Sequence, residues 1–248
     1  MPQTVQVHLL PSLVAPDALA NGTVVVIDVL RATTTIVYAL AHRAREVVPC
    51  MEVEEARQTA ALIGASAVLG GERGGVLIEG FDLGNSPDEY TADRVAGKSV
   101  VFTTTNGTQA IRCCHQAGRV LIGAFVNFSA LCDAVTEATD LHLLCAGTGS
   151  DVTREDTMLA GAIVDDAFRR NAETRLNDQA EIAADTWRAA ENAITGRRLL
   201  ADSLRRSQGG RNILAVGLER DIDLAAEIDR FTIVPELDRQ TGRIVVPQ

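Results

Sequence analysis

The sequence is poor in aromatic residues and has no long apolar run. Phe, Trp and Tyr together make up 4% of the 248 residues, although hydrophobic types as a whole make up 46%. A core must therefore be built mainly from Val, Ile, Leu and Ala. No apolar run reaches the roughly 18 residues of a membrane helix, and the N-terminus lacks the pattern of a signal peptide. We expect a cytoplasmic protein with no membrane partner.

Paired cysteines and an excess of basic residues are also missing. The five cysteines are odd in number and form no Cys-x-x-Cys pair, which favours a reducing compartment over a disulfide framework. The net charge of −10 at pH 7 argues against nucleic acid as a partner, because duplex binding needs a basic face. A small anionic substrate is still allowed, since a few arginines in one cleft are enough to bind it.

One stretch near the N-terminus has the pattern of a site in an α/β fold. Val24–Ile27 reads as a buried strand, and a polar turn containing Asp28 and Arg31 follows it. Thr33 or Thr34 is predicted to cap the next helix. The turn would lie at the carboxyl end of the strand, where the helix start offers free N–H groups and the positive end of its dipole. The aspartate can hold a metal and the arginine an anion.

The same order of strand, polar turn and helix occurs twice more. Ser99–Phe102 runs into the turn 103–108, and Leu141–Cys145 runs into the turn 146–150. One such turn is weak evidence, but three in register are stronger. If the three strands are parallel members of one sheet, their turns meet at one edge and form one site.

The rest of the chain supports an α/β fold of three layers, α/β/α. We predict a largely parallel or mixed sheet, a helical C-terminal third and a terminal β-hairpin. Residues 70–75 are too rich in glycine for regular structure, and residues 76–97 are predicted to form an ordered functional loop. Further strands are predicted at Gln3–Leu10, Glu46–Pro49, Ala67–Leu69, Phe231–Val234 and Arg243–Val246, and helices at Glu52–Ile63, Gln109–His115, Asn127–Thr139, for about 15 residues from Arg154, and at Asp178–Ala193, Arg197–Ser207 and Asp221–Phe231.

No linker divides the chain. We therefore predict a single phosphatase-like unit spanning residues 1–248. The internal repeat also allows two intertwined similar halves, of about 1–97 and 98–248, with no firm boundary. The sequence is also compatible with a homodimer.

Several familiar sites are disfavoured by the residues present. A phosphoaspartate nucleophile at Asp28 would need a second aspartate two residues on, where Leu30 stands. A cysteine phosphatase would need Arg six residues after Cys145, where Asp151 stands. The histidines lack metal spacing, and no Walker motif is present. Asp28 remains either a Mg²⁺ ligand or a turn cap, and Arg31 and Arg73 bind either an anion or a surface carboxylate.

A set of short motifs, each weak alone, is specific in its order. From about Val5 to the C-terminus the chain resembles the 2-phosphosulfolactate phosphatase family. The resemblance implies a Mg²⁺-dependent phosphomonoester hydrolase of α/β type, which converts (R)-2-phospho-3-sulfolactate and water to 3-sulfolactate and phosphate on the way to coenzyme M. The motifs are DVLRATTT (28–35), GER (71–73), GNSP (84–87), TTTNGT (103–108) and CAGT (145–148), followed by Glu155-Asp156.

The resemblance, added to the residue types, assigns a role to each candidate residue. The group that activates water stays open, and so do two alternatives: another enzyme acting on a small phosphorylated hydroxy acid, and a non-catalytic anion-binding protein. The assigned residues are Asp28, Arg31, Glu72 and Arg73 for catalysis, Thr33, Asn85, Ser86, Thr104, Thr105, Asn106, Gly107, Thr108, Gly147 and Thr148 for substrate binding, and Asp28, Glu155 and Asp156 for Mg²⁺.

Overall fold

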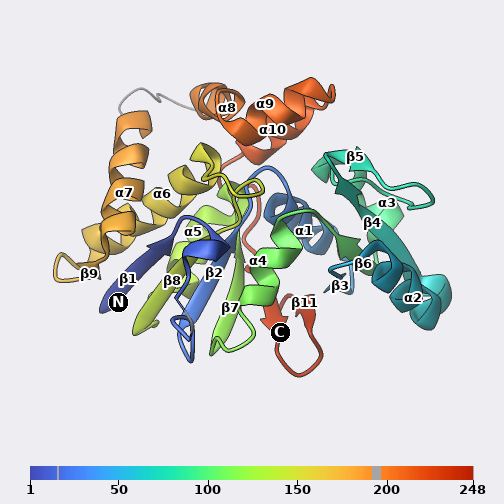
Figure 1. The fold of residues 1–248 in the computed structure, drawn as a ribbon, viewed down its shortest axis with the longest axis horizontal. Helices are drawn as coiled ribbons and strands as arrows, with labels where there is room; N and C mark the ends of the chain where they lie inside the picture. The colour runs from blue at the N-terminus through green and yellow to red at the C-terminus, as the bar shows by residue number, and fades with distance from the viewer. Residues whose placement is uncertain (16, 192–196, 248) are drawn as a thin grey trace.

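The fold is an α/β sandwich of three layers, as predicted (Figure 1). The computed structural model describes residues 1–15, 17–191 and 197–247. In this part of the chain one mixed sheet has the strand order β5-β4-β6-β3-β11-β10-β7-β2-β8-β1-β9. Its strands are β1 (Thr4–His8), β2 (Thr23–Ile27), β3 (Glu46–Pro49), β4 (Ala67–Arg73), β5 (Val76–Leu77), β6 (Ser99–Thr103), β7 (Arg119–Gly123), β8 (Asp140–Cys145), β9 (Arg175–Leu176), β10 (Glu236–Asp238) and β11 (Arg243–Val245).

Helices cover both faces of the sheet. Within the described ranges, none is both long and apolar enough to cross a membrane. The α-helices are α1 (Ala32–Ala41), α2 (Val53–Ile63), α3 (Ala92–Val95), α4 (Gly107–Cys113), α5 (Phe128–Ala134), α6 (Arg154–Arg170), α7 (Asp178–Glu191), α8 (Arg197–Arg205), α9 (Gln208–Ala215) and α10 (Glu219–Ala225).

Strand β2 contributes to both of the larger hydrophobic clusters. It is apolar on both faces, as expected for a strand that is covered on both sides. Val25 and Ile27 pack into the cluster that contains α6 and α7, whereas Val24 and Val26 pack into the cluster that contains α1 and α4. The aliphatic composition therefore suffices for a three-layer core.

The sheet consists of two parallel groups joined by the terminal hairpin. Strand β2 runs parallel to β7 and β8, and β6 runs parallel to β3 and β4. The hairpin β10–β11 lies between the groups and pairs antiparallel with β7 on one side and β3 on the other. In Figure 1 the β1–β8–β2–β7 group is on the left and the β3–β6–β4 group on the right.

This insertion corrects the prediction that all three site strands are parallel. Three antiparallel pairings separate β2 from β6, so these two strands run in opposite sense along the sheet. Only β2 and β8 are parallel neighbours. The expectation failed because the last strands of the chain enter the middle of the sheet, which the local pattern around β6 cannot show.

Several element boundaries also differ from the predicted ones. Strand β4 continues through the glycines to Arg73 and turns back as β5, because Gly74 and Gly75 supply the positive φ angles of a tight hairpin. Helix α1 starts at Ala32, so Thr33 and Thr34 lie inside it and do not cap it. Helix α4 starts at Gly107, two residues earlier than expected.

The C-terminal third holds further differences. Helix α9 and the short strand β9 were not predicted, and α10 is shorter than expected, as is α5 in the middle of the chain. Residues 231–234 form no strand, and the first hairpin strand is Glu236–Asp238. The last two residues of the helix predicted to end at Ala193 lie outside the described residues.

Close packing of α6 on α7 depends on one glycine. A Cβ atom built on Gly161 would lie 1.9 Å from the backbone oxygen of Ala183 and 2.9 Å from the Cβ of Trp187. The facing side of α7 presents buried alanines at positions 180, 183 and 184. The two helix backbones therefore approach so closely that position 161 has no room for a side chain.

We predict that Gly161→Ala lowers the free energy of unfolding by about 2 kcal/mol, because overpacking outweighs the higher helix propensity of alanine. Urea denaturation measures this change. Glu181→Ala, on the exposed side of α7, is the control and should change the free energy of unfolding by less than about 0.5 kcal/mol. Equal stability of Gly161→Ala and the wild type would contradict the packing described here.

Candidate active site

A cavity of about 490 Å³ lies where the turns after β2, β6 and β8 come together beneath α9. Its volume is within the range of small-molecule sites. The lining includes three charged side chains, those of Asp28, Arg31 and Glu72. The full lining is Asp28, Leu30, Arg31, Glu72, Gly74, Gly75, Asn85, Thr105, Asn106, Thr148, Gly149, Gly209, Asn212, Ile213, Ala215 and Val216.

The turn after β6 reaches this cavity although β6 runs in the opposite sense to β2. Gly107, the first residue of α4, packs directly on the start of α1. A Cβ atom there would lie 2.4 Å from the Cβ of Ala32 and 2.8 Å from Oδ2 of Asp28. A residue without a side chain is therefore needed where the two groups of strands meet. Gly107 has a structural part in the site, whatever its role in substrate binding.

Asp28 is held at the end of β2 by the first turn of α1. One carboxylate oxygen accepts a hydrogen bond from the Ala32 N–H at 3.2 Å. The Thr33 hydroxyl accepts from the Asp28 N–H at 3.0 Å and donates to the Asp28 carbonyl at 2.8 Å. Thr33, predicted to bind substrate, is fully buried and instead fixes the backbone that carries Asp28.

The environment of Asp28 disfavours its charged form. Its pKa is raised to about 7, chiefly by burial and also by the negative charges of Glu72 and Glu155. The Ala32 N–H and the Arg31 charge act in the opposite direction. A cation placed beside Asp28 would relieve this penalty.

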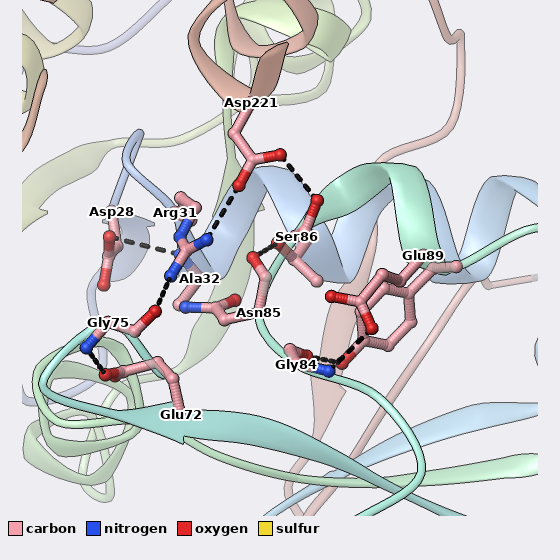
Figure 2. Close-up of polar contacts among 12 residues, drawn as sticks. Asp28, Arg31, Ala32, Glu72, Gly75, Gly84, Asn85, Ser86, Glu89 and Asp221 are labelled. Atoms are coloured by element: carbon pink, nitrogen blue, oxygen red, sulfur yellow. Dashed lines mark hydrogen bonds and ion pairs between the residues drawn. The ribbon is translucent and has the colours of Figure 1, made fainter. Parts of the chain in front are cut away.

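Glu72 joins two of the loops that form the cavity. Its Oε2 accepts from the Gly75 N–H at 2.7 Å (Figure 2). Its Oε1 accepts from the Thr105 N–H at 2.8 Å. The carboxylate thus ties the β4–β5 hairpin to the turn after β6. Both of its oxygens are engaged by backbone donors, which suits a positioning role.

Arg31 is buried and held from two sides (Figure 2). Its guanidinium donates from Nη1 to Asp221 at 2.7 Å and from Nη2 to the Gly75 carbonyl at 3.0 Å. The other oxygen of Asp221 accepts from the Ser86 hydroxyl. Because a guanidinium has five N–H donors, Arg31 retains donors for a ligand in the cavity that it lines.

Asp221 is a site residue that the sequence analysis missed. It lies on α10, far along the chain, and its side chain is 2% exposed. Burial raises the pKa of Asp221, against the lowering effect of the hydrogen bonds from Ser86 and Arg31. One acid in an amphipathic helix gives no signal of this role, so only the structure reveals it.

Asp156, predicted to bind Mg²⁺, joins the turn after β2 to the turn after β8. Its Oδ1 accepts from the Val29 N–H at 2.8 Å, and its Oδ2 accepts from the Gly147 N–H at 3.0 Å. Burial raises the pKa of Asp156 well above its usual value, with further contributions from Glu155 and Asp28. With both oxygens engaged, Asp156 is a positioning residue in this structure.

Glu155 has a different environment at the start of α6. Its Oε2 is buried without a hydrogen-bond partner among the described residues. It lies directly beneath α9, since a Cβ atom on Gly209 would come within 2.1 Å of Oε1. Burial raises the pKa of Glu155. An unpartnered buried carboxylate oxygen is the kind of atom that a bound cation satisfies.

The predicted Mg²⁺ ligands can be tested against this geometry. Within the described ranges, no group of three or more His, Cys, Asp or Glu side chains is arranged to hold a metal ion. Asp28 and Glu155 are close enough for their charges to interact, and Glu155 has an oxygen to spare. The two carboxylates of Asp28 and Glu155 fit a Mg²⁺ ion, because Mg²⁺ in proteins takes its remaining ligands from substrate oxygens and water.

Four of the predicted substrate-binding residues line the cavity, namely Asn85, Thr105, Asn106 and Thr148. The Asn85 Oδ1 is buried without a partner among the described residues, and Asn106 Oδ1 accepts from the Gly149 N–H at 3.0 Å. These side chains leave amide and hydroxyl groups available to a polar ligand.

The other predicted substrate-binding residues do not line it. Thr104 and Thr108 hydrogen-bond to each other across the first turn of α4. Ser86 donates to Asp221. A Cβ atom on Gly147 would meet Leu10 at 2.3 Å, so this glycine serves the close packing of its turn.

Arg73 also points away from the cavity. Its guanidinium donates to the Met51 carbonyl at 2.8 Å, to the Thr103 hydroxyl at 2.9 Å and to the carbonyl of Glu72 at 2.8 Å. It is absent from the lining, whereas its neighbour Glu72 is part of it. Because side chains alternate along a strand, Glu72 and Arg73 face opposite sides of β4.

The cover of the cavity is the second feature that the sequence analysis missed. Helix α9 and the residue that follows it contribute Gly209, Asn212, Ile213, Ala215 and Val216 to the lining. Ser207 caps this helix by accepting from the Gly210 N–H at 3.0 Å. Ser207 and the two glycines after it could have predicted the start of this helix. They could not have predicted that the helix covers the cavity.

Comparison with known proteins places these residues in a family. Residues 8–240 match the family described as 2-phosphosulpholactate phosphatase. A protein of Symbiobacterium thermophilum named "Probable 2-phosphosulfolactate phosphatase" is 42% identical over 221 residues, which are 88% of this chain and 92% of the relative. Proteins of the same name are 35% identical in Clostridium acetobutylicum, over 89% of this chain and 91% of the relative, and 35% identical in Carboxydothermus hydrogenoformans, over 93% and 94%.

We predict that Asp28→Asn stabilises the metal-free protein above neutral pH. The pKa of Asp28 is about 7 in the folded state and 3.8 ordinarily. Between these values the folded state keeps a proton that the unfolded state has lost, so wild-type stability falls as the pH rises. The gain for Asp28→Asn should reach at most about 4 kcal/mol near pH 8 and vanish toward pH 4.

Urea denaturation in chelator-containing buffer across this pH range measures the difference. Asp93→Asn removes an exposed carboxylate and should leave the pH profile of the wild type unchanged. Parallel profiles for Asp28→Asn and the wild type would show that burial does not disfavour the Asp28 charge.

Proposed function

The chain belongs to the 2-phosphosulfolactate phosphatase family, and from this premise we propose that it is a Mg²⁺-dependent phosphomonoester hydrolase. Its proposed reaction converts (R)-2-phospho-3-sulfolactate and water to 3-sulfolactate and phosphate. The observation that carries the proposal is the placement of Arg31. Its guanidinium is fixed by Asp221 and Gly75 and lines the same cavity as Asp28.

The charge balance of the cavity supports a metal in this reaction. The lining carries the carboxylates of Asp28 and Glu72 and the guanidinium of Arg31, which already faces Asp221. The proposed substrate brings a phosphate, a carboxylate and a sulfonate. A ligand with three acidic groups would be repelled unless further positive charge entered with it. A divalent cation at Asp28 and Glu155 would supply that charge.

Some residues of this chain would bind the substrate, and others would hold those residues in position. Arg31 would bind the phosphoryl oxygens through its free N–H donors, since planar guanidinium geometry suits phosphate. Asn85, Asn106 and Thr148 would orient the acidic groups of the substrate. Three further residues position these groups without binding substrate. Asp221 holds Arg31, whereas Glu72 and Asp156 hold the loops of the cavity in place.

Mg²⁺, when bound by Asp28 and Glu155, would supply charge stabilisation for the phosphoryl group. Asp28 lies beside the ligand space, and its raised pKa makes it able to hold a proton near neutral pH in the absence of a cation. Glu72 would position the loops around the substrate, because both of its oxygens accept backbone hydrogen bonds.

We predict that the purified protein releases inorganic phosphate from 2-phosphosulfolactate in the presence of Mg²⁺ and not in the presence of a chelator. Asp28→Asn should reduce turnover at least about a hundredfold, because a lost metal ligand removes transition-state stabilisation. A phosphate assay with 2-phospholactate and 3-phosphoglycerate beside the proposed substrate tests substrate choice. Phosphate from none of them would exclude the hydrolase, and full activity in chelator would exclude the metal.

We further predict that Arg31→Lys raises the KM for the phosphorylated acid by about tenfold or more, because lysine keeps the charge but loses the planar fork. Arg73→Lys is the matched control and should change KM far less, since Arg73 does not line the cavity. Steady-state kinetics of both variants give the comparison. Equal effects of the two substitutions would show that Arg31 has no special contact with the substrate.

A further inference from the structure

A second cavity, of about 380 Å³, has one wall formed by α4. Three segments far apart in sequence form it: the chain after β3, helix α4 and the terminal hairpin β10–β11. Figure 1 shows the hairpin next to the lower end of α4. The lining is Pro49, Cys50, Met51, Glu55, Thr108, Ile111, Arg112, Cys114, His115, Leu237, Arg239 and Gly242. The volume is enough for a small molecule.

Two arginines give this cavity a positive character. Arg112 comes from α4 and Arg239 from the turn of the hairpin. Both are exposed, and neither forms an ion pair or a side-chain hydrogen bond with any residue in the described part of the chain, whereas Arg119, Arg169, Arg205 and Arg243 are paired with acids. In a chain with a net charge of −10, two unpaired arginines at one cavity favour an anion there.

One acidic residue, Glu55, also lines the cavity, so the two arginines leave a net positive charge there. Glu55 serves the capping box of α2, where its Oε2 accepts from the Met51 N–H at 2.7 Å and from the Glu52 N–H at 3.4 Å. Its Oε2 is therefore directed at the helix start.

The remaining surface of the cavity is apolar. Pro49, Ile111 and Leu237 supply hydrocarbon. Burial raises the pKa of the Cys50 thiol to about 11 and that of Cys114 to about 12, so both sulfurs stay neutral and contribute apolar area. A ligand that fills this space needs an apolar body as well as a negative group.

We propose that this second cavity binds a small organic anion, whose acidic group lies against Arg112 and Arg239 and whose hydrocarbon body lies on Ile111 and Leu237. The site is separate from the first cavity, and the proposal does not depend on the proposed phosphatase reaction. Helix α4 lines only the second cavity. Thr108 and Ile111 line the second cavity, whereas Asn106, the residue before the helix, lines the first.

NMR of the full-length protein with ¹³C-labelled methionine methyl groups tests the proposal without any activity assay. The chain has three methionines, of which Met51 lines the second cavity and Met158 is fully buried elsewhere. Naphthalene-2-sulfonate is the probe, because it combines a negative group with an apolar body and carries no phosphate ester. We expect the Met51 signal, assigned with Met51→Leu, to shift on titration and the Met158 signal to stay in place.

Charge variants show where the probe binds. Arg112→Gln/Arg239→Gln should weaken probe binding by about tenfold or more, since charge-assisted contacts are the strongest polar ones available. Arg175→Gln removes an exposed positive charge on β9 and should not change the affinity. A Met51 signal that does not move, unchanged affinity in the double variant, or a loss of affinity in Arg31→Lys in place of the double variant would each overturn the assignment of this cavity.

Discussion

The site depends on buried carboxylates that accept hydrogen bonds from backbone N–H groups of neighbouring turns. Asp156 joins the turns after β2 and β8, and Glu72 joins the β4–β5 hairpin to the turn after β6. The turns come from two groups of strands that run in opposite sense, so their meeting is not a simple result of sheet topology. The carboxylates fix the turns relative to one another. Asp28, Thr105 and Thr148 lie on or beside these turns and face the cavity from them.

This arrangement has an energetic cost that points to its use. Burying a carboxylate without a cation is unfavourable, and the charges of Asp28, Glu155 and Asp156 repel one another. Backbone donors offset part of the penalty for Asp156, but Glu155 keeps an unpartnered oxygen. A protein that retains such a cluster in its interior loses stability there. The loss is understandable where the cluster receives a cation during function.

Much of the fold and part of the site could be predicted from the sequence. Val24–Ile27 is continuous and apolar, and a strand covered on both faces needs that pattern, so both β2 and the position of Asp28 at its end could be predicted. Local patterns also located α2, β3 and β6. They could not show that Asp221 reaches Arg31, because that contact joins residues far apart in the chain and no periodicity encodes it. Nor could they show that Arg73 faces away from the cavity, since the glycine-rich segment does not read as a strand.

The position of the terminal hairpin has a consequence for biosynthesis. Strand β11 pairs with β3 although it is made about 200 residues later, and β10 completes the edge of β7. Until residues 236–245 have been made, β3 and β7 expose unpaired backbone edges, which are the kind of edge that other chains can join. The two groups of strands can therefore form one sheet only after these residues have left the ribosome.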